Sequence, residues 1–347
     1  MRKSRAEQMQ FWRFIAFFHV FLQHTMDWNG FLHYPSFKSG LIAISFFFML
    51  SGALSGYNAP GRTEKPAIGD VLRHGLRKLK GFYPLYIVMI AISLFSSGLI
   101  VEVAQRNLSG IVRQTGRLGV HLLMLQSWFP STYFDFTGVG WFFSTILMLY
   151  LCQLPFGWLL GRLRRRTVWL LLAALAAVSV ALQYGLTFTK DAYFFKYIFP
   201  PARVWEYLIG MTVGYLVRTK GESAKPKAWF TALEWLSMAV WVGAIFTCPD
   251  NWTDIAVWWL LPNALVLWVF LQGGGAVSAL FGRKPLVMLG DCVFECVLIH
   301  GMLLDLYTYL CPVAAMPGGV AGAVSLGVTL LATVLLANRL HGASRRA

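Results

Sequence analysis

The apolar stretch 11–28 carries three side chains that could do chemistry, namely Arg13, His19 and His24. In a helix, Arg13 and His24 share one face, because eleven residues make about three turns and span about 16 Å, whereas His19 points elsewhere. A guanidinium binds anionic groups, and an imidazole can act as a general base. The pair suits an anionic donor that enters at one end and reacts near His24. Alternatively, Arg13 extends its charged end to the membrane surface, and His24 is a structural residue hydrogen-bonded to a neighbouring carbonyl.

Three other apolar stretches carry polar side chains that are costly in a membrane, at about 3 kcal/mol for a charge at its centre. Arg203 and Glu206 stand three residues apart, so they can pair, and the pair is either structural or binds an acceptor. His300 either reaches the same site or is a buried imidazole with a local partner. Ser51 precedes Gly52, where a small residue favours close helix packing, and a substrate contact is the alternative.

The elements that position these residues are membrane helices. Of 347 residues, 57% are hydrophobic and 13% are charged, which excludes an ordinary soluble protein. The net charge is +15, and the basic residues that produce it lie mostly between the apolar segments. They therefore indicate membrane topology rather than a nucleic-acid partner. The composition predicts an all-α polytopic membrane protein of about ten transmembrane helices, at 11–28, 41–57, 82–100, 141–160, 168–186, 203–217, 230–247, 255–271, 286–307 and 319–337.

Basic residues are unevenly divided between the connections. Twenty-two of the 30 Lys and Arg residues lie in 1–10, 58–81, 161–167, 218–229, 272–285 and 338–347, and six lie in the alternate connections. This bias predicts that both termini are cytoplasmic. The apolar segment 118–129 is too short to span, and we interpret it as an outer re-entrant or interfacial piece. A disulfide between Cys248 and Cys311, both in outer connections, is left open.

A basic cluster precedes the third predicted helix and contains Arg73, Arg77, Lys78 and Lys80. It can anchor the chain to anionic lipid on the cytoplasmic side. Clustered cations can equally hold the phosphates of coenzyme A. Cys292 and Cys296 share a face without a third or fourth ligand in evidence, so we expect packing there and no metal site.

Several motifs follow one another in a recognisable order. They are Arg13-x10-His24, the segment 45–52 (SFFFMLSG), the segment 77–86 (RKLKGFYPLY), Trp141-Phe142-Phe143-Ser144 with Tyr150 and Pro155, the segment 203–211 (RVWEYLIGM), and Leu289-Gly290 with His300. Together they resemble the membrane acyltransferase-3 family, from residue 11 to residue 300. Gly81, Ile146, Val293 and Phe294 depart from the family pattern, which leaves the subfamily and the acceptor open.

The resemblance implies a single transmembrane domain over 1–347, without an appended soluble domain, in a bacterial cytoplasmic (inner) membrane. It implies an O-acyltransferase that moves an acyl group, chiefly acetyl, from cytoplasmic acetyl-CoA to a hydroxyl of a glycan or lipid-linked glycan, with no bound cofactor. His24 and Arg13 would be catalytic, and the basic cluster would hold the donor. Ser51, Trp141, Arg203, Glu206 and His300 would bind the acceptor. A secondary transporter is the alternative, since ten helices with intramembrane charges also describe carriers.

Overall fold

The computed structural model describes residues 6–25, 40–58, 64–95, 98–220, 228–247, 255–311 and 319–344, and these contain helices and turns but no strand. The elements are α1 (Gln8–His24), α2 (Gly40–Asn58), α3 (Ile68–Leu79), α4 (Tyr83–Leu94), α5 (Gly98–Ala104), α6 (Leu108–Leu122), η3 (Gln126–Trp128), α7 (Gly140–Arg162), α8 (Arg165–Leu186), η4 (Phe194–Ile198), α9 (Pro200–Thr219), α10 (Ala228–Phe246), α11 (Ile255–Gln272), α12 (Ala276–Phe281), α13 (Lys284–Asp291), α14 (Val293–Leu310) and α15 (Gly319–Ser344).

Five of the described helices are long and apolar enough to cross a membrane, namely α7, α8, α10, α14 and α15. Each of the ten predicted segments contains a helix, so the all-helical prediction is confirmed for the described residues. Together with their apolar faces, these helices identify a multi-pass membrane protein.

Two predicted helices differ from the structure. The segment predicted at 82–100 is helical in α4 for 12 residues, or about 18 Å, and a turn at Phe95 precedes α5. The segment predicted at 286–307 is divided between α13 and α14 at Cys292, whose φ of −96° and ψ of 13° are not helical. Gly290, just before this break, lets α13 approach α1, because a Cβ there would fall on the carbonyl oxygen of Gln10.

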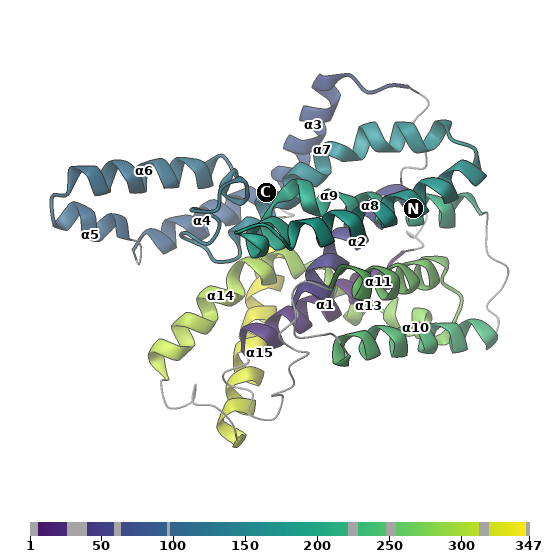
Figure 1. The fold of residues 1–347 in the computed structure, drawn as a ribbon. Coiled ribbons are helices and arrows are strands. Elements are labelled where there is room, and N and C mark those ends of the chain that lie inside the picture. Colours follow the sequence, from purple (N-terminus) through teal and green to yellow (C-terminus); the bar gives the residue numbers. More distant parts are fainter. Residues whose placement is uncertain are drawn as a thin grey trace.

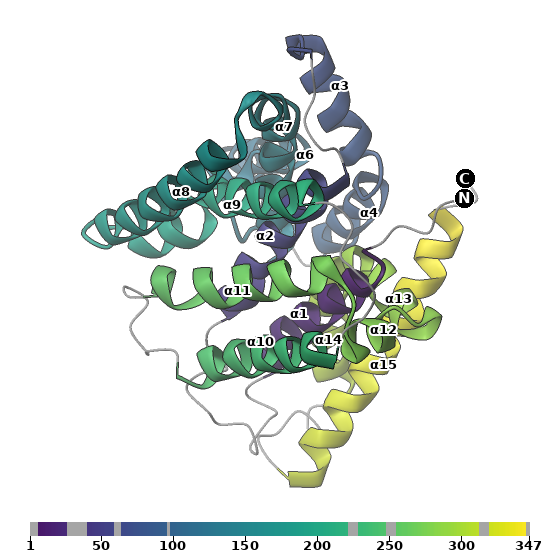
Figure 2. The same ribbon diagram turned by 90° about the vertical axis from the view of Figure 1, so that its right-hand side faces the viewer.

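Helix α1 lies among α2, α11, α12, α13 and α14, and α2 packs closely along α9 (Figures 1 and 2). The α2–α9 contact depends on glycine. A Cβ on Gly52 would fall on the carbonyl oxygen of Tyr207, and a Cβ on Gly210 would fall on that of Met49. Small residues at four-residue spacing let helix backbones approach in this way. The structure therefore places Ser51 beside a close-packing glycine.

The hairpin of α5 and α6 extends away from the other helices (Figure 1). The predicted interfacial segment 118–129 consists of the end of α6 and the short helix η3. Buried hydrogen bonds fasten it to the core: Gln126 donates to Tyr86 Oη at 3.0 Å, and Ser144 Oγ donates to the carbonyl of Met124 at 2.6 Å. The imidazole of His121 donates through Nε2 to the carbonyl of Thr132 at 2.9 Å. Cys248 lies outside the described residues, so its predicted pairing is not addressed by the structure.

Candidate active site

A small pocket of about 110 Å³ lies where α1, α2, α7, α14 and η4 meet. It brings together three residues predicted from separate helices: His24 at the end of α1, Trp141 at the start of α7 and His300 in the middle of α14. The lining is completed by Val20, Gln23, Ile44, Phe47, Phe134, Gly138, Val139, Phe142, Tyr193, Tyr197 and Val297. The site is thus mostly aromatic, with a pair of imidazoles in its wall.

The two imidazoles are joined by a hydrogen bond of 2.9 Å between His300 Nε2 and His24 Nδ1. His300 Nδ1 lies 2.9 Å from the carbonyl oxygen of Val297 and 3.2 Å from that of Cys296. A carbonyl oxygen can accept but not donate, so Nδ1 of His300 carries a proton. In the neutral ring, Nε2 of His300 then accepts a hydrogen bond from Nδ1–H of His24. This leaves Nε2 of His24 as an unprotonated nitrogen, the form that a general base requires.

Packing fixes the orientation of this histidine pair. His300 is fully buried, and its ring meets the edge or face of Phe17 at 5.6 Å and of Phe21 at 6.4 Å between centroids. The rings of His24 and His300 stack at 5.0 Å with an angle of 23°. His24 itself is exposed where α1 ends at the pocket. His19, by contrast, is buried with its ring 6.3 Å from that of Trp241 on α10.

The opposite part of the pocket is an aromatic wall. The rings of Trp141 and Tyr197 lie 4.7 Å apart, those of Tyr193 and Tyr197 lie 5.3 Å apart, and Phe134 lies 6.4 Å from Tyr193. Tyr193 and Tyr197 come from the π-helical turn η4 and the residue before it. The charge pattern of the sequence places 187–202 in an outer connection and does not indicate either tyrosine. Their i, i+4 spacing in an aromatic run before Pro200 was the available signal, and π-turns are frequent at functional sites.

Arg203 and Glu206 form a buried ion pair of 3.0 Å next to this wall. Ser45 bridges them, accepting from Arg203 at 3.0 Å and donating to Glu206 at 2.9 Å. The guanidinium also donates to the carbonyl of Lys196 at 3.3 Å and lies 6.0 Å from the centre of the Tyr197 ring. Neither side chain lines the pocket, and nor does Ser51. The pair therefore positions η4, and through it Tyr197, from behind.

Arg13 lies toward the other end of α1, in a cationic region. The Cζ atom of its guanidinium lies 6.0 Å from the centre of the Phe294 ring, and Nη1 donates to Oε1 of Gln10 at 2.9 Å. Lys78 on α3 interacts electrostatically with Arg13, and Lys78 Nζ lies 5.3 Å from the centre of the Tyr150 ring. Partial burial lowers the pKa of the Lys78 ammonium, and the charges of Arg13 and Arg77 lower it further. An anion bound here would relieve that repulsion.

The four residues of the basic cluster are arranged along α3. Arg73 pairs with Asp70 at 3.6 Å on an exposed face, and Arg77 and Lys80 are also exposed. Lys78 is exposed as well, and it is the member of the cluster whose ammonium interacts electrostatically with Arg13. Between Arg13 and His24, the same face of α1 carries Phe17 and Val20, which are both buried. The helix thus joins a cationic region to the histidine pair through an apolar middle.

Among the described residues, no group of three His, Cys, Asp or Glu side chains is placed to hold a metal ion. A family model described as an acyltransferase domain matches residues 7–338, nearly the whole chain. Neither a curated protein nor a solved structure matches the sequence significantly. With the motifs in family order and the all-helical fold, this match shows that the chain belongs to the acyltransferase-3 family of membrane proteins.

Proposed function

We propose that this acyltransferase moves an acetyl group from cytoplasmic acetyl-CoA to a hydroxyl of a glycan at the outer face of a bacterial cytoplasmic membrane. The observation that carries the proposal is the unprotonated Nε2 of His24, held by His300 in a small pocket. The opposite end of the same helix carries Arg13 beside Lys78, where a phosphate-rich donor finds cations. A transporter is not favoured, because the family to which the chain belongs is one of acyltransferases.

The size of the pocket supports acetyl as the acyl group. Its volume of about 110 Å³ is small beside the roughly 300–1,000 Å³ of common ligand pockets. We infer that a short acyl group fits this space better than a long chain does. A series from acetyl-CoA to octanoyl-CoA should therefore show turnover that falls steeply beyond two or three carbons. Equal turnover of octanoyl-CoA would contradict this assignment.

In direct transfer, Nε2 of His24 takes the proton from the acceptor hydroxyl as the oxygen attacks the thioester carbonyl. The carbon–sulfur bond then breaks, and the imidazolium returns the proton to the thiolate, giving an ester and free coenzyme A. In a relay, Nε2 attacks the thioester carbonyl and the carbon–sulfur bond breaks, releasing the thiolate of coenzyme A. The acceptor oxygen then attacks the carbonyl of the acyl-imidazole, the carbon–nitrogen bond breaks to restore the neutral ring, and the hydroxyl proton passes to the thiolate. Both routes use the same nitrogen and the same orientation of the ring by His300.

The decisive experiment uses purified protein with radiolabelled acetyl-CoA and a glycan acceptor. His24→Ala should abolish acceptor-dependent release of coenzyme A, and His19→Gln, a substitution on the same helix but outside the pocket, should retain most of it. Label retained on the wild type without acceptor, and absent from His24→Ala, indicates the relay; no retained label indicates direct transfer. If folded His24→Ala transfers at the wild-type rate, the active site is assigned wrongly.

The donor site is tested at the other end of α1. Lys78→Gln and Arg13→Lys should raise KM for acetyl-CoA, because a neutral amide loses the charge and a point ammonium cannot reproduce the two-pronged guanidinium contact. Lys65→Gln is a matched control, since this lysine lies 5.9 Å from the ring centre of Trp158, away from Arg13. If KM for acetyl-CoA is unchanged in both Lys78→Gln and Arg13→Lys, the donor does not bind in this region.

The proposed topology has ten crossing helices with both termini in the cytoplasm. It is supported by the distribution of basic residues and by a helix in every predicted segment. Single cysteines introduced at Arg164 and at Thr115 test it, since the first should react with impermeant maleimide only after the membrane is opened and the second in intact cells. Labelling of position 164 from outside would reverse the orientation.

A further inference from the structure

Helix α3 stands at the edge of the molecule and lies across α7, as Figures 1 and 2 show. One side of α3 packs on α7. A Cβ on the buried Gly75 would meet the side chain of Leu151, and Nε2 of His74 donates to Oε1 of Gln153 at 2.8 Å. Because α7 is long and apolar enough to cross the membrane, a helix that lies across it follows the plane of the membrane.

The other side of α3 carries a stripe of apolar side chains. Ile68, Leu72 and Leu76 are 82%, 52% and 58% exposed. They are four residues apart, so at about 100° per residue they occupy a sector of about 80° on the helix. Large apolar side chains exposed in so regular a row mark a contact surface, because contact with water is unfavourable for them. The stripe therefore requires an apolar partner.

A row of basic side chains borders this stripe. Arg73, Arg77 and Lys80 are exposed and lie within about 60° of one another, next to Leu76. The acidic residue of α3, Asp70, pairs with Arg73 at 3.6 Å. Within the described part of the chain, no ion pair involves Arg77 or Lys80. We call the apolar stripe and the basic row together the α3 face.

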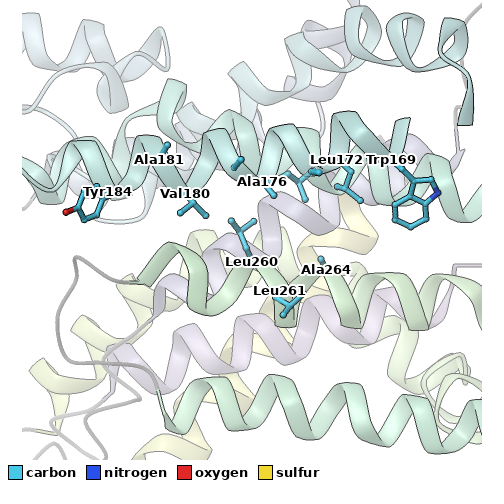
Figure 3. A pocket seen from close by; sticks show the side chains of 12 residues that line it. Trp169, Leu172, Ala176, Val180, Ala181, Tyr184, Leu260, Leu261 and Ala264 are labelled. Atoms are coloured by element: carbon cyan, nitrogen blue, oxygen red, sulfur yellow. The ribbon is translucent and has the colours of Figure 1, made fainter. Parts of the chain in front are cut away.

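This charge distinguishes the α3 face from another exposed apolar surface of the protein. The open face between α8 and α11 is lined by aliphatic and aromatic side chains without a charged one (Figure 3). Such a surface accepts any apolar partner. A row of cations beside an apolar stripe instead fits a partner whose apolar interior ends at an anionic boundary.

A membrane surface that contains anionic lipid has this composition, since its acyl chains lie beneath a layer of phosphates. The position of α3 agrees with such a surface, because Lys78 of α3 interacts electrostatically with Arg13, near the start of α1. In the proposed topology the start of α1 is close to the cytoplasm. A helix from a second copy could cover the apolar stripe, but it would leave the neighbouring cations without counter-charge.

The fourth cation of the basic cluster lies on the other side of α3. Lys78 is about 100° from Arg77 and about 160° from Lys80 around the helix. Its Nζ lies 5.3 Å from the centre of the Tyr150 ring on α7. The two sides of α3 thus carry different cations, with Lys78 toward α7 and the Arg13 region and the basic row away from them.

We propose that α3 lies in the membrane surface and binds the head groups of anionic phospholipids through its basic row, Arg73, Arg77 and Lys80. The apolar stripe enters the acyl chains beside these head groups. The inference goes beyond the proposed function, because it assigns three of the four cations of the cluster to the lipid surface and leaves Lys78 for the donor. It does not depend on acyl transfer.

Photolabelling of the full-length protein in phosphatidylcholine nanodiscs tests this binding. The probes are phosphatidylglycerol and phosphatidylcholine, each with the same diazirine in one acyl chain close to the head group. The phosphatidylglycerol probe should label the segment 68–80 more strongly by about fivefold or more, since one basic residue near an anionic surface already strengthens attraction about fivefold. Added salt should reduce the preference, because it screens exposed charges. Equal labelling by the two probes, or no label on this segment, would overturn the proposal.

Two double variants with the same loss of charge locate the lipid site. Arg73→Gln with Arg77→Gln should bring the preference for phosphatidylglycerol to within about twofold. Arg164→Gln with Arg166→Gln removes two exposed cations that follow α7, and it should retain the wild-type preference. If both double variants lose the preference equally, the overall charge of the protein attracts the lipid and the α3 face does not.

Excess coenzyme A, added to the nanodiscs before illumination, determines whether the donor occupies the same cations. Labelling of the segment 68–80 by phosphatidylglycerol should be unchanged. If coenzyme A displaces the probe, the basic row holds the donor and the proposal is wrong. Photolabelling requires neither an acceptor nor turnover, so its result is valid whether or not the protein transfers an acyl group to a glycan.

Discussion

Replacement of His300 tests whether this residue sets the protonation pattern of His24. His300→Leu keeps most of the buried volume but removes the acceptor that lies 2.9 Å from His24 Nδ1. Without that acceptor, the proton of neutral His24 is no longer held on Nδ1, and the ring loses one of its orienting contacts. His300→Gln is the matched variant, because its Oε1 can accept the same proton at the end of a side chain of similar length.

The magnitude follows from that one hydrogen bond. A net contribution of about 1 kcal/mol gives at least a fivefold loss, since ~1.4 kcal/mol is tenfold in rate. Outer partners that orient a functional imidazole are commonly worth about 10 to 100-fold, and the aspartate of a serine-protease triad is worth about 10⁴-fold. We therefore expect His300→Leu to lower kcat by about 10 to 100-fold, with KM for acetyl-CoA unchanged because the Arg13 region is not altered.

The assay is the initial rate of coenzyme A release against the concentrations of donor and acceptor, on protein whose monodispersity and melting temperature match the wild type. His300→Gln should remain within about tenfold of the wild-type kcat. A wild-type kcat in His300→Leu would refute the argument that His300 fixes the tautomer of His24. Equal loss in the Leu and Gln variants would refute the acceptor role and point to a proton held by the imidazole itself.

Three further predictions concern the parts of the fold that hold this site. Gly52→Ala should lower the melting temperature by several degrees because its Cβ meets the backbone of α9, while Gly243→Ala, with open space around it, should be neutral in the same thermal unfolding assay. Glu206→Ala should cost about 3–5 kcal/mol by leaving Arg203 buried and unpaired, and changing both residues to Met should recover most of the loss, which urea unfolding in detergent would measure. Burial lowers the pKa of His121, so as the pH drops below about 6.5 the imidazole takes up a proton in the unfolded chain before it does so in the folded protein, and the stability of the fold should decrease. His121→Gln should therefore lose less of its melting temperature between pH 7 and pH 5 than the wild type. An equal decrease in both proteins would exclude His121 as the cause.

The elements that could be predicted from the sequence are those defined by long apolar stretches. Each such segment contains a helix, because length and hydropathy suffice to indicate one in a membrane. The ends of these helices depend on local contacts instead. The break at Cys292 follows the close approach of Gly290 to Gln10 in α1, and that approach cannot be seen in either segment alone.

The candidate site could be predicted in part. The alignment of Arg13 and His24 follows from helical spacing, which is a local property. The hydrogen bond of His24 to His300 joins residues 276 positions apart, so no spacing rule indicates it. Tyr197 was missed because its turn lies outside the apolar spans and adopts a π-helical form, which sequence periodicity does not distinguish from a loop.

The apolar middle of α1 has an electrical consequence. Phe17 and Val20 are buried between the cations near Arg13 and the imidazole of His24, so a charge moving between these two regions would have to leave polar surroundings. Across a membrane potential of 100 mV, each elementary charge that crosses completely changes the free energy by ~2.3 kcal/mol. A donor whose phosphates remain at the cationic end sends only a neutral acyl group toward the pocket. We therefore expect the rate of transfer in energised vesicles to be independent of the potential, and the protein to conduct no ions while it turns over.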